Sequence, residues 1–266
     1  MLNHTIKTWH RILLRRSIRA ISVLEARLDP IITGWIVIMV GAGLFKILRA
    51  PIPPHGAQSM LATLFPYLLV CLAPVAGYRI ASGSFPTHIL PGQPLVRLAQ
   101  FGRWRQLGLM SARRHPAYGP AGLLASLIIG LLLNIPVRTL ELLAAMPALN
   151  AQAPVWARTM NIAMTGDVIV MNFFYAVCFV LALRSVPLFP RLLVFTWCMD
   201  IVMQFVIARA VTGAPGLPDA IRGLLLHLLQ GNIDKVLISA FIWLPYLLLS
   251  ERVNVTFRWR AARSAG

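Results

Sequence analysis

The sequence predicts an all-α, polytopic helical membrane protein with about six transmembrane helices and an amphipathic surface helix at the N-terminus. Its 266 residues are 58% hydrophobic and 12% charged, with a mean hydropathy of +0.73, whereas soluble domains carry about 25% charged residues. Several apolar runs approach the ~20 residues that are needed to cross a bilayer. The net charge of +17 arises from 25 Lys and Arg against 8 Asp and Glu, which suits cationic contacts with lipid headgroups better than nucleic-acid binding.

Six apolar stretches predict the transmembrane helices. Asp29-Pro30 precedes the first stretch, and Pro136 is expected to bend the third. A short amphipathic helix over 218–230 is expected at the outer membrane interface, between the fifth and sixth spans. The predicted spans are 31–48, 59–78, 119–143, 161–183, 190–211 and 232–250.

Residues 1–28 predict a basic amphipathic helix that lies at the membrane surface. Its apolar residues fall roughly on one helical face, and five basic residues fall mostly elsewhere. The apolar set is Ile6, Trp9, Leu13, Ile21, Leu24 and Leu28. A plain cytoplasmic leader that satisfies the positive-inside rule fits the same residues, and the two interpretations are compatible.

The distribution of basic residues predicts the topology. With six spans, 18 of the 25 Lys and Arg fall in segments on the side of the two termini, and 7 fall on the other side. Cytoplasmic segments are the ones enriched in Lys and Arg. We therefore expect a multi-pass protein of a bacterial inner membrane with both termini cytoplasmic.

The chain divides into a surface helix (1–28), a transmembrane domain (29–252) and a basic cytoplasmic tail (253–266). Within the transmembrane domain, 79–118 is the longest loop and is expected to be cytoplasmic. Its basic, aromatic piece at 101–115 could form a second surface helix anchored by Phe101 and Trp104.

Both ends of the transmembrane domain resemble a known family. The first span carries Gly34-Trp35, and the last span and its exit read FIWLPYLLLSERVNVTFRWR. This combination resembles the domain of unknown function 2569 family of bacterial inner-membrane proteins, which implies a helical fold and a location but no reaction. Members are shorter and look four-spanning. The matching residues at the exit are Trp243, Pro245, Tyr246, Ser250, Arg252, Val253, Thr256 and Phe257.

Several polar residues fall within the predicted spans, where charges are costly and usually face the interior of the bundle. Asn134, Arg138 and Glu141 share one helical face by their spacing. Most of the set falls in the outer halves of its helices, and Arg138 is expected to pair with Asp167 or Asp200. The candidate cluster is Asn134, Arg138, Glu141, Asp167, Asp200, Gln204, Asp234 and Lys235. Two interpretations stay open: ion pairs and helix ends that stabilise packing, or a site for a substrate or ion.

Three functions remain compatible with the sequence. A non-enzymatic accessory or assembly component of an envelope complex is the leading hypothesis. A small transporter or ion-coupled permease using the Arg138, Asp167 and Asp200 cluster is the second, and a membrane enzyme acting on a lipid-linked substrate is the third. No nucleotide, metal or nucleophile motif is present, so we expect no cofactor or metal. Expected partners are anionic headgroups and either a membrane protein or further copies of this chain.

Overall fold

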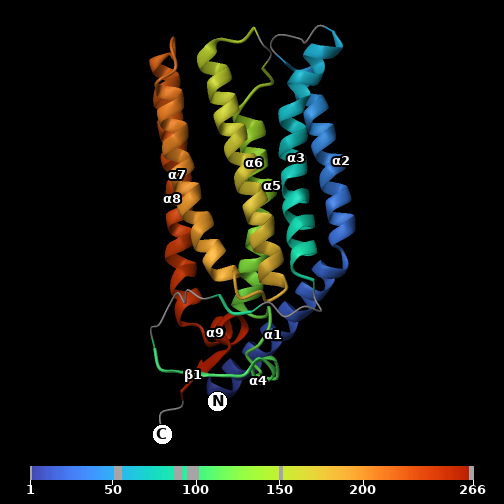
Figure 1. Ribbon diagram of the computed structural model, residues 1–266, viewed down its shortest axis with the longest axis vertical. Helices are drawn as coiled ribbons and strands as arrows, with labels where there is room; N and C mark the ends of the chain where they lie inside the picture. Colours follow the sequence, from blue (N-terminus) through green and yellow to red (C-terminus); the bar gives the residue numbers. More distant parts are fainter. Residues whose placement is uncertain (1, 51–55, 87–91, 95–101, 150–151, 264–266) are drawn as a thin grey trace.

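Six long apolar helices form a bundle whose two chain termini lie at the same end, which we call the terminal end (Figure 1). The computed structural model describes residues 2–50, 56–86, 92–94, 102–149 and 152–263. By length and composition, six helices could cross a membrane: α2 (Leu28–Leu48), α3 (Ala57–Ser84), α5 (Leu123–Ala145), α6 (Val155–Leu183), α7 (Phe189–Thr212) and α8 (Asp219–Leu249). The predicted fold class, a polytopic helical membrane protein, is confirmed.

Helix α6 is the central element of the bundle and packs against α3, α5 and α7. In its most apolar stretch 67% of the residues are buried, compared with 11% in α8. Gly77 allows α3 to approach α6 closely, because a Cβ at this position would lie 2.6 Å from the carbonyl oxygen of Phe173. The outward faces of α2 and α8 remain apolar and exposed, as lipid contact requires.

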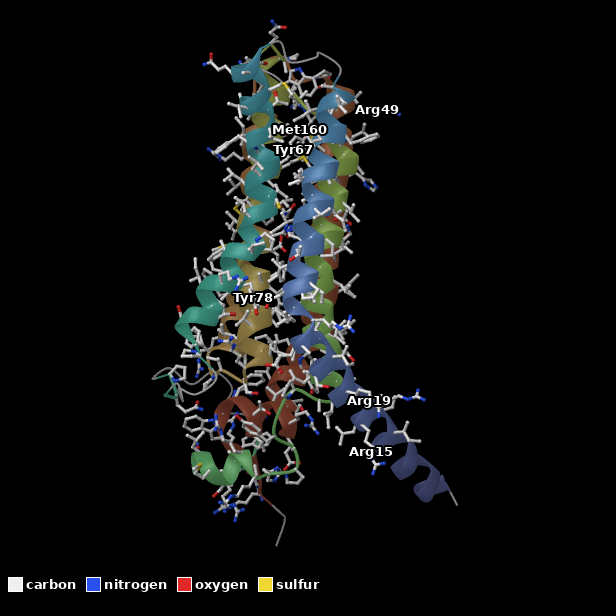
Figure 2. All side chains as sticks on the ribbon, turned by 90° about the vertical axis from the view of Figure 1, so that its right-hand side faces the viewer. Arg15, Arg19, Arg49, Tyr67, Tyr78 and Met160 are labelled. Carbon is white, nitrogen blue, oxygen red and sulfur yellow. The ribbon has the colours of Figure 1, made fainter. Side chains whose placement is uncertain are left out.

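Helix α1 (Leu2–Ala26) precedes α2 and leaves the bundle at an angle at the terminal end, as Figure 2 shows. It is fixed where it meets α5, because the Ser17 hydroxyl accepts a 2.8 Å hydrogen bond from the backbone N–H of Gly122. Ile21 and Leu28 of the predicted apolar face are buried, whereas Leu13 is exposed. The side chains of Ile6 and Trp9 lie outside the described residues.

A small cap covers the bundle at the terminal end. It contains β1 (Trp104–Gln106), α4 (Leu109–Arg113), α9 (Glu251–Arg258) and β2 (Arg260–Ala262), and β1 pairs antiparallel with β2. A single surface helix over 101–115 is therefore wrong, because in the described part of this segment only Leu109–Arg113 is helical. Phe101, one of its two predicted anchors, lies outside the described residues. The reason is tertiary: the returning chain end supplies a partner strand, and the Arg260 guanidinium lies 5.1 Å from the centre of the Trp104 ring.

Several helix boundaries also differ from the prediction. Helix α3 continues to Ser84, so residues 79–84 of the predicted loop 79–118 are helical, and α6 begins at Val155 rather than at 161. The third span begins at Leu123 rather than at 119, because Gly119 and Gly122 have positive φ values of 93° and 62°. The separate helix predicted over 218–230 is wrong, since α8 runs unbroken from Asp219 to Leu249. A single glycine, Gly231, is too weak a breaker to end a helix between two long apolar stretches.

Candidate functional site

A cavity of about 730 Å³ lies between α5, α6, α7 and α8, and we call it the polar cavity after the charged cluster in its otherwise largely apolar wall. Each helix contributes polar side chains at helical spacing, while aliphatic residues together with Trp197 and Trp243 complete the wall. The polar residues that line the cavity are Asn134, Arg138, Glu141, Asp167, Tyr175, Asp200, Gln204, His227, Asn232, Lys235 and Ser239.

Arg138 of α5 lies at the centre of this set and bridges two other helices. Its Nη1 and Nη2 donate to Asp200 Oδ2 and Oδ1 of α7 at 2.8 and 2.7 Å, a bidentate pair. Nη2 also donates to Asp167 Oδ2 of α6 at 2.7 Å. The sequence predicts a pair with either aspartate; in the structure Arg138 contacts both.

The two aspartates differ in how fully their oxygens are satisfied. Asp200 is fully buried and, besides Arg138, accepts from the Tyr175 hydroxyl at 2.9 Å and from Gln204 Nε2 at 3.3 Å. Asp167 accepts one short bond from Arg138 and a long one, 3.5 Å, from Gln204 Nε2. Asp167 is therefore the carboxylate with acceptor capacity left over.

The hydrogen-bond network extends to α8, the fourth helix of the cavity wall. Asn232 of α8 donates from Nδ2 to Gln204 Oε1 at 3.2 Å. A little more than one turn after Asp167 in α6, buried Asn172 donates from Nδ2 to the Thr139 hydroxyl at 2.8 Å. All four helices of the cavity therefore share one connected set of polar contacts centred on Arg138.

Two buried polar atoms in this region have no hydrogen-bond partner within the described residues. They are Nε of Arg138 and Oδ1 of Asn172. Leaving a buried donor or acceptor unpaired costs about 1–3 kcal/mol. The cluster therefore retains an unused donor beside the cavity.

The cluster lies close to mid-membrane rather than at a helix end. Asp167 follows the start of α6 by 12 residues and Asp200 follows the start of α7 by 11 residues, which is about 17–18 Å along each axis. An unpaired Arg at the centre of a bilayer costs about 2.5–3.5 kcal/mol or more. The two aspartates offset this cost, and the cluster has two carboxyl groups for one guanidinium group.

A second ion pair joins α5 to α8 at the edge of the cavity. Lys235 Nζ donates to Glu141 Oε1 at 2.6 Å, and both side chains are about half exposed. Because this pair is balanced, the five charged residues lining the cavity carry one carboxylate in excess. Such a lining favours a cation or a proton over an anion.

Seven of the eight residues in the predicted cluster line the cavity; Asp234 does not. It is exposed and accepts instead from Gln230 Nε2 of the preceding turn at 2.9 Å. Sequence reasoning missed Tyr175, whose only signal was its position two turns after Asp167 in the same helix. Among the described residues, no group of three or more His, Cys, Asp or Glu could hold a metal ion.

The residues that resemble the family tail lie elsewhere, in α8 and the cap. Phe257 is buried with its ring centre 5.0 Å from that of Phe189. The Thr256 hydroxyl accepts from the backbone N–H of Gly119 at 3.0 Å, and Arg252 donates to the carbonyl of Gly119 at 3.4 Å. These contacts tie the chain end to the start of α5.

The upstream part of that tail lies at the end of α8. Trp243 and Tyr246 pack edge to face with ring centres 5.9 Å apart, and Pro245 lies within the helix. Ser250 separates α8 from α9, and its carbonyl accepts from the backbone N–H of Asn254 at 3.0 Å. Arg252, Thr256 and Phe257 therefore attach the chain end to the bundle, whereas Trp243 lines the cavity.

Comparison with protein-family models, curated proteins and solved structures finds no match to this chain.

Proposed function

We propose that the protein is a permease of a bacterial inner membrane that binds a small cationic solute, or a proton, at the Arg138–Asp167–Asp200 cluster. The observation that carries the proposal is the excess carboxylate: Arg138 shares one positive charge between two buried aspartates in the wall of a cavity of about 730 Å³. Intramembrane ionisable residues of this kind mark ion and substrate pathways. The terminal end faces the cytoplasm in this proposal, since it carries most of the Lys and Arg.

In this proposal Asp167 binds the cation, and Asp200 holds Arg138 in place. Asp200 has the bidentate contact with Arg138 and the hydroxyl of Tyr175. Asp167 makes one short contact and faces the cavity. A cation that binds Asp167 neutralises the excess charge without breaking the Arg138–Asp200 pair, so binding and release need little rearrangement.

Uptake of radiolabelled guanidinium, a permanent cation small enough for the cavity, tests this function. The full chain is reconstituted into vesicles of phosphatidylethanolamine and phosphatidylglycerol. We expect saturable uptake that Asp167→Asn lowers at least about tenfold, which corresponds to ~1.4 kcal/mol.

Asp219→Asn is the matched control for this experiment. It makes the same chemical change on a cavity helix, but at a fully exposed carboxylate near Arg222. Equal uptake by the wild type, both variants and empty vesicles would contradict the proposal for this class of solute.

A second candidate is an accessory or assembly component of an envelope complex, and it rests on the outward face of α8. Phe241 is 83% exposed, and neighbouring apolar residues of α8 are exposed with it. Lipid covers such a face equally well. Purification in mild detergent with a second membrane protein in fixed stoichiometry, lost in Phe241→Ser, would favour this role.

Membership of the domain of unknown function 2569 family is likewise a proposal. It is supported by the Gly34-Trp35 pair and by the tail from Trp243 to Phe257. The contacts of the tail with Gly119 and Phe189 give those residues a structural reason to occur together.

A further inference from the structure

A second, apolar groove of about 810 Å³ lies on another side of the bundle, between α1, α2, α3, α5 and α6. Helix α2 packs against α3, whereas α5 packs against α6 and α1. Helix α1 contacts both α2 and α5, so it crosses the terminal end of the groove.

The walls of the groove are apolar. They include Trp35 of α2, Val75 of α3, Leu132 of α5 and Phe179 of α6. The indole N–H of Trp35 already donates to the carbonyl of Cys71 at 2.9 Å, so its ring lines the groove without an unpaired donor. These walls suit a hydrocarbon chain.

The rim of the groove is basic. Arg16 and Arg19 of α1 are exposed, as is Arg27 between α1 and α2, and these three are the charged residues among its described lining. None of the three forms an ion pair with a carboxylate of the described residues. Three positive charges therefore lie beside an apolar groove that has no negative charge among its described lining residues.

The rim is held in place by α1. The hydrogen bond from the backbone N–H of Gly122 to the Ser17 hydroxyl and the buried side chain of Ile21 attach α1 to the bundle. Figure 2 shows α1 sloping away from the bundle, with Arg15 and Arg19 along it. This places guanidinium groups at the level where the spans end, which is where lipid phosphates lie.

We propose that this groove binds one anionic phospholipid from the leaflet at the terminal end. Arg16, Arg19 and Arg27 contact the phosphate and the anionic headgroup, and the acyl chains lie against Trp35, Leu132 and Phe179. The proposal is independent of the permease function, because the groove and the polar cavity are lined by separate sets of charged residues.

Native mass spectrometry of the full chain tests the proposal. Protein purified in mild detergent is incubated with an equimolar mixture of dioleoyl phosphatidylglycerol and dioleoyl phosphatidylcholine. A basic residue near an anionic lipid contributes about fivefold in binding. Three arginines therefore predict retention of one phosphatidylglycerol with a preference on the order of 100-fold.

Two triple variants of equal charge separate a site from general electrostatic attraction. Arg16→Gln, Arg19→Gln and Arg27→Gln together should remove the preference for phosphatidylglycerol. Arg103→Gln, Arg105→Gln and Arg113→Gln together, in exposed positions of the cap, should leave it unchanged. Equal loss in both variants, or equal retention of the two lipids by the wild type, would overturn the proposal.

A variant that fills the groove provides a test without any charge change. Val75→Trp should prevent retention of phosphatidylglycerol, while Ile238→Trp on the exposed face of α8 should not. Unfolding temperatures of both variants confirm that the protein is folded. Full retention by a folded Val75→Trp protein would exclude the groove as the site.

Discussion

Two clusters of buried polar side chains among the described residues are satisfied in different ways. In the cap, Asn254 is fully buried and uses both ends of its amide: Nδ2 donates to the carbonyls of Leu248 and Ser250, and Oδ1 accepts from Arg258 and Arg260. In the spans, Arg138, Asp167 and Asp200 contact one another and line a cavity. The first cluster divides its hydrogen bonds between main-chain carbonyls and side chains, whereas the ion pairs of the second join side chains only.

This difference separates a structural role from a binding role. Contacts with main-chain carbonyls hold the chain path and leave no capacity for a ligand. In the cap, Arg258 also donates to the carbonyl of Leu247 at 2.7 Å, although burial and the nearby Arg260 and Arg191 lower the pKa of Arg258 to about 10. The membrane cluster instead keeps an excess carboxylate and the unused Nε of Arg138.

The largest loss of stability is expected for Arg138→Ala. It leaves Asp167 and Asp200 buried near mid-membrane without a counter-charge, and breaking a buried ion pair costs about 3–5 kcal/mol. Unfolding in mixed micelles of detergent and dodecyl sulfate measures the change in free energy. A change below about 1 kcal/mol would show that the aspartates are already neutral or hydrated.

A smaller loss, about 3 kcal/mol, is expected for Asn254→Ala. The change removes the shared acceptor of Arg258 and Arg260, and hydrogen bonds to charged groups contribute about 1.5–3 kcal/mol each. We expect the lower end of this range for both bonds, because Arg258 keeps its hydrogen bond to the carbonyl of Leu247. The same unfolding measurement applies, with no effect on guanidinium uptake by the protein that remains folded. Loss of uptake from folded protein would erase the distinction between the two clusters.

Asp167→Asn is expected to lower uptake strongly and stability only slightly. The bidentate Arg138–Asp200 pair survives and is balanced in charge, so we expect a change in the free energy of unfolding of about 1 kcal/mol or less. Uptake falls at least about tenfold by the same reasoning as above. Strong destabilisation with normal uptake in the surviving protein would make Asp167 a packing residue.

The smallest change in stability is expected for Lys235→Gln. Its pair with Glu141 is about half exposed, and exposed ion pairs contribute about 0.2–1 kcal/mol. The variant removes one positive charge from the cavity lining, so we expect faster uptake of guanidinium at low salt. Loss of several kcal/mol would instead identify the pair as a structural link between α5 and α8.

The sequence predicts the spans and most of the membrane cluster, because both depend on local patterns. Apolar runs predict the six helices, and the spacing of Asn134, Arg138 and Glu141 places them on one face of α5. Tyr175 could not be assigned, since a tyrosine two turns from an aspartate gains meaning only when α7 brings Asp200 beside it. The cap was missed for the same reason: strands of three residues have no periodicity of their own.

Helix α8 shows how two neighbouring sequence patterns can predict two helices where the structure has one. Its first part reads as an amphipathic interface helix and its second part as a span, yet one helix contains both. The join falls at Gly231, next to Asn232, which donates to Gln204 in the cluster. Tertiary contact overrides the weak local tendency of a glycine to end the helix.

The most direct measurement is the reactivity of a cysteine at position 232 with charged thiosulfonate reagents. In a background that lacks the native cysteines, Asn232→Cys in the cavity is compared with Phe241→Cys on the exposed apolar face of α8. We predict that Asn232→Cys reacts in intact membranes, and about tenfold faster with a cationic reagent than with an anionic one, which corresponds to ~1.4 kcal/mol. Reactivity no greater than that of Phe241→Cys would contradict an aqueous, cation-selective site at the cluster.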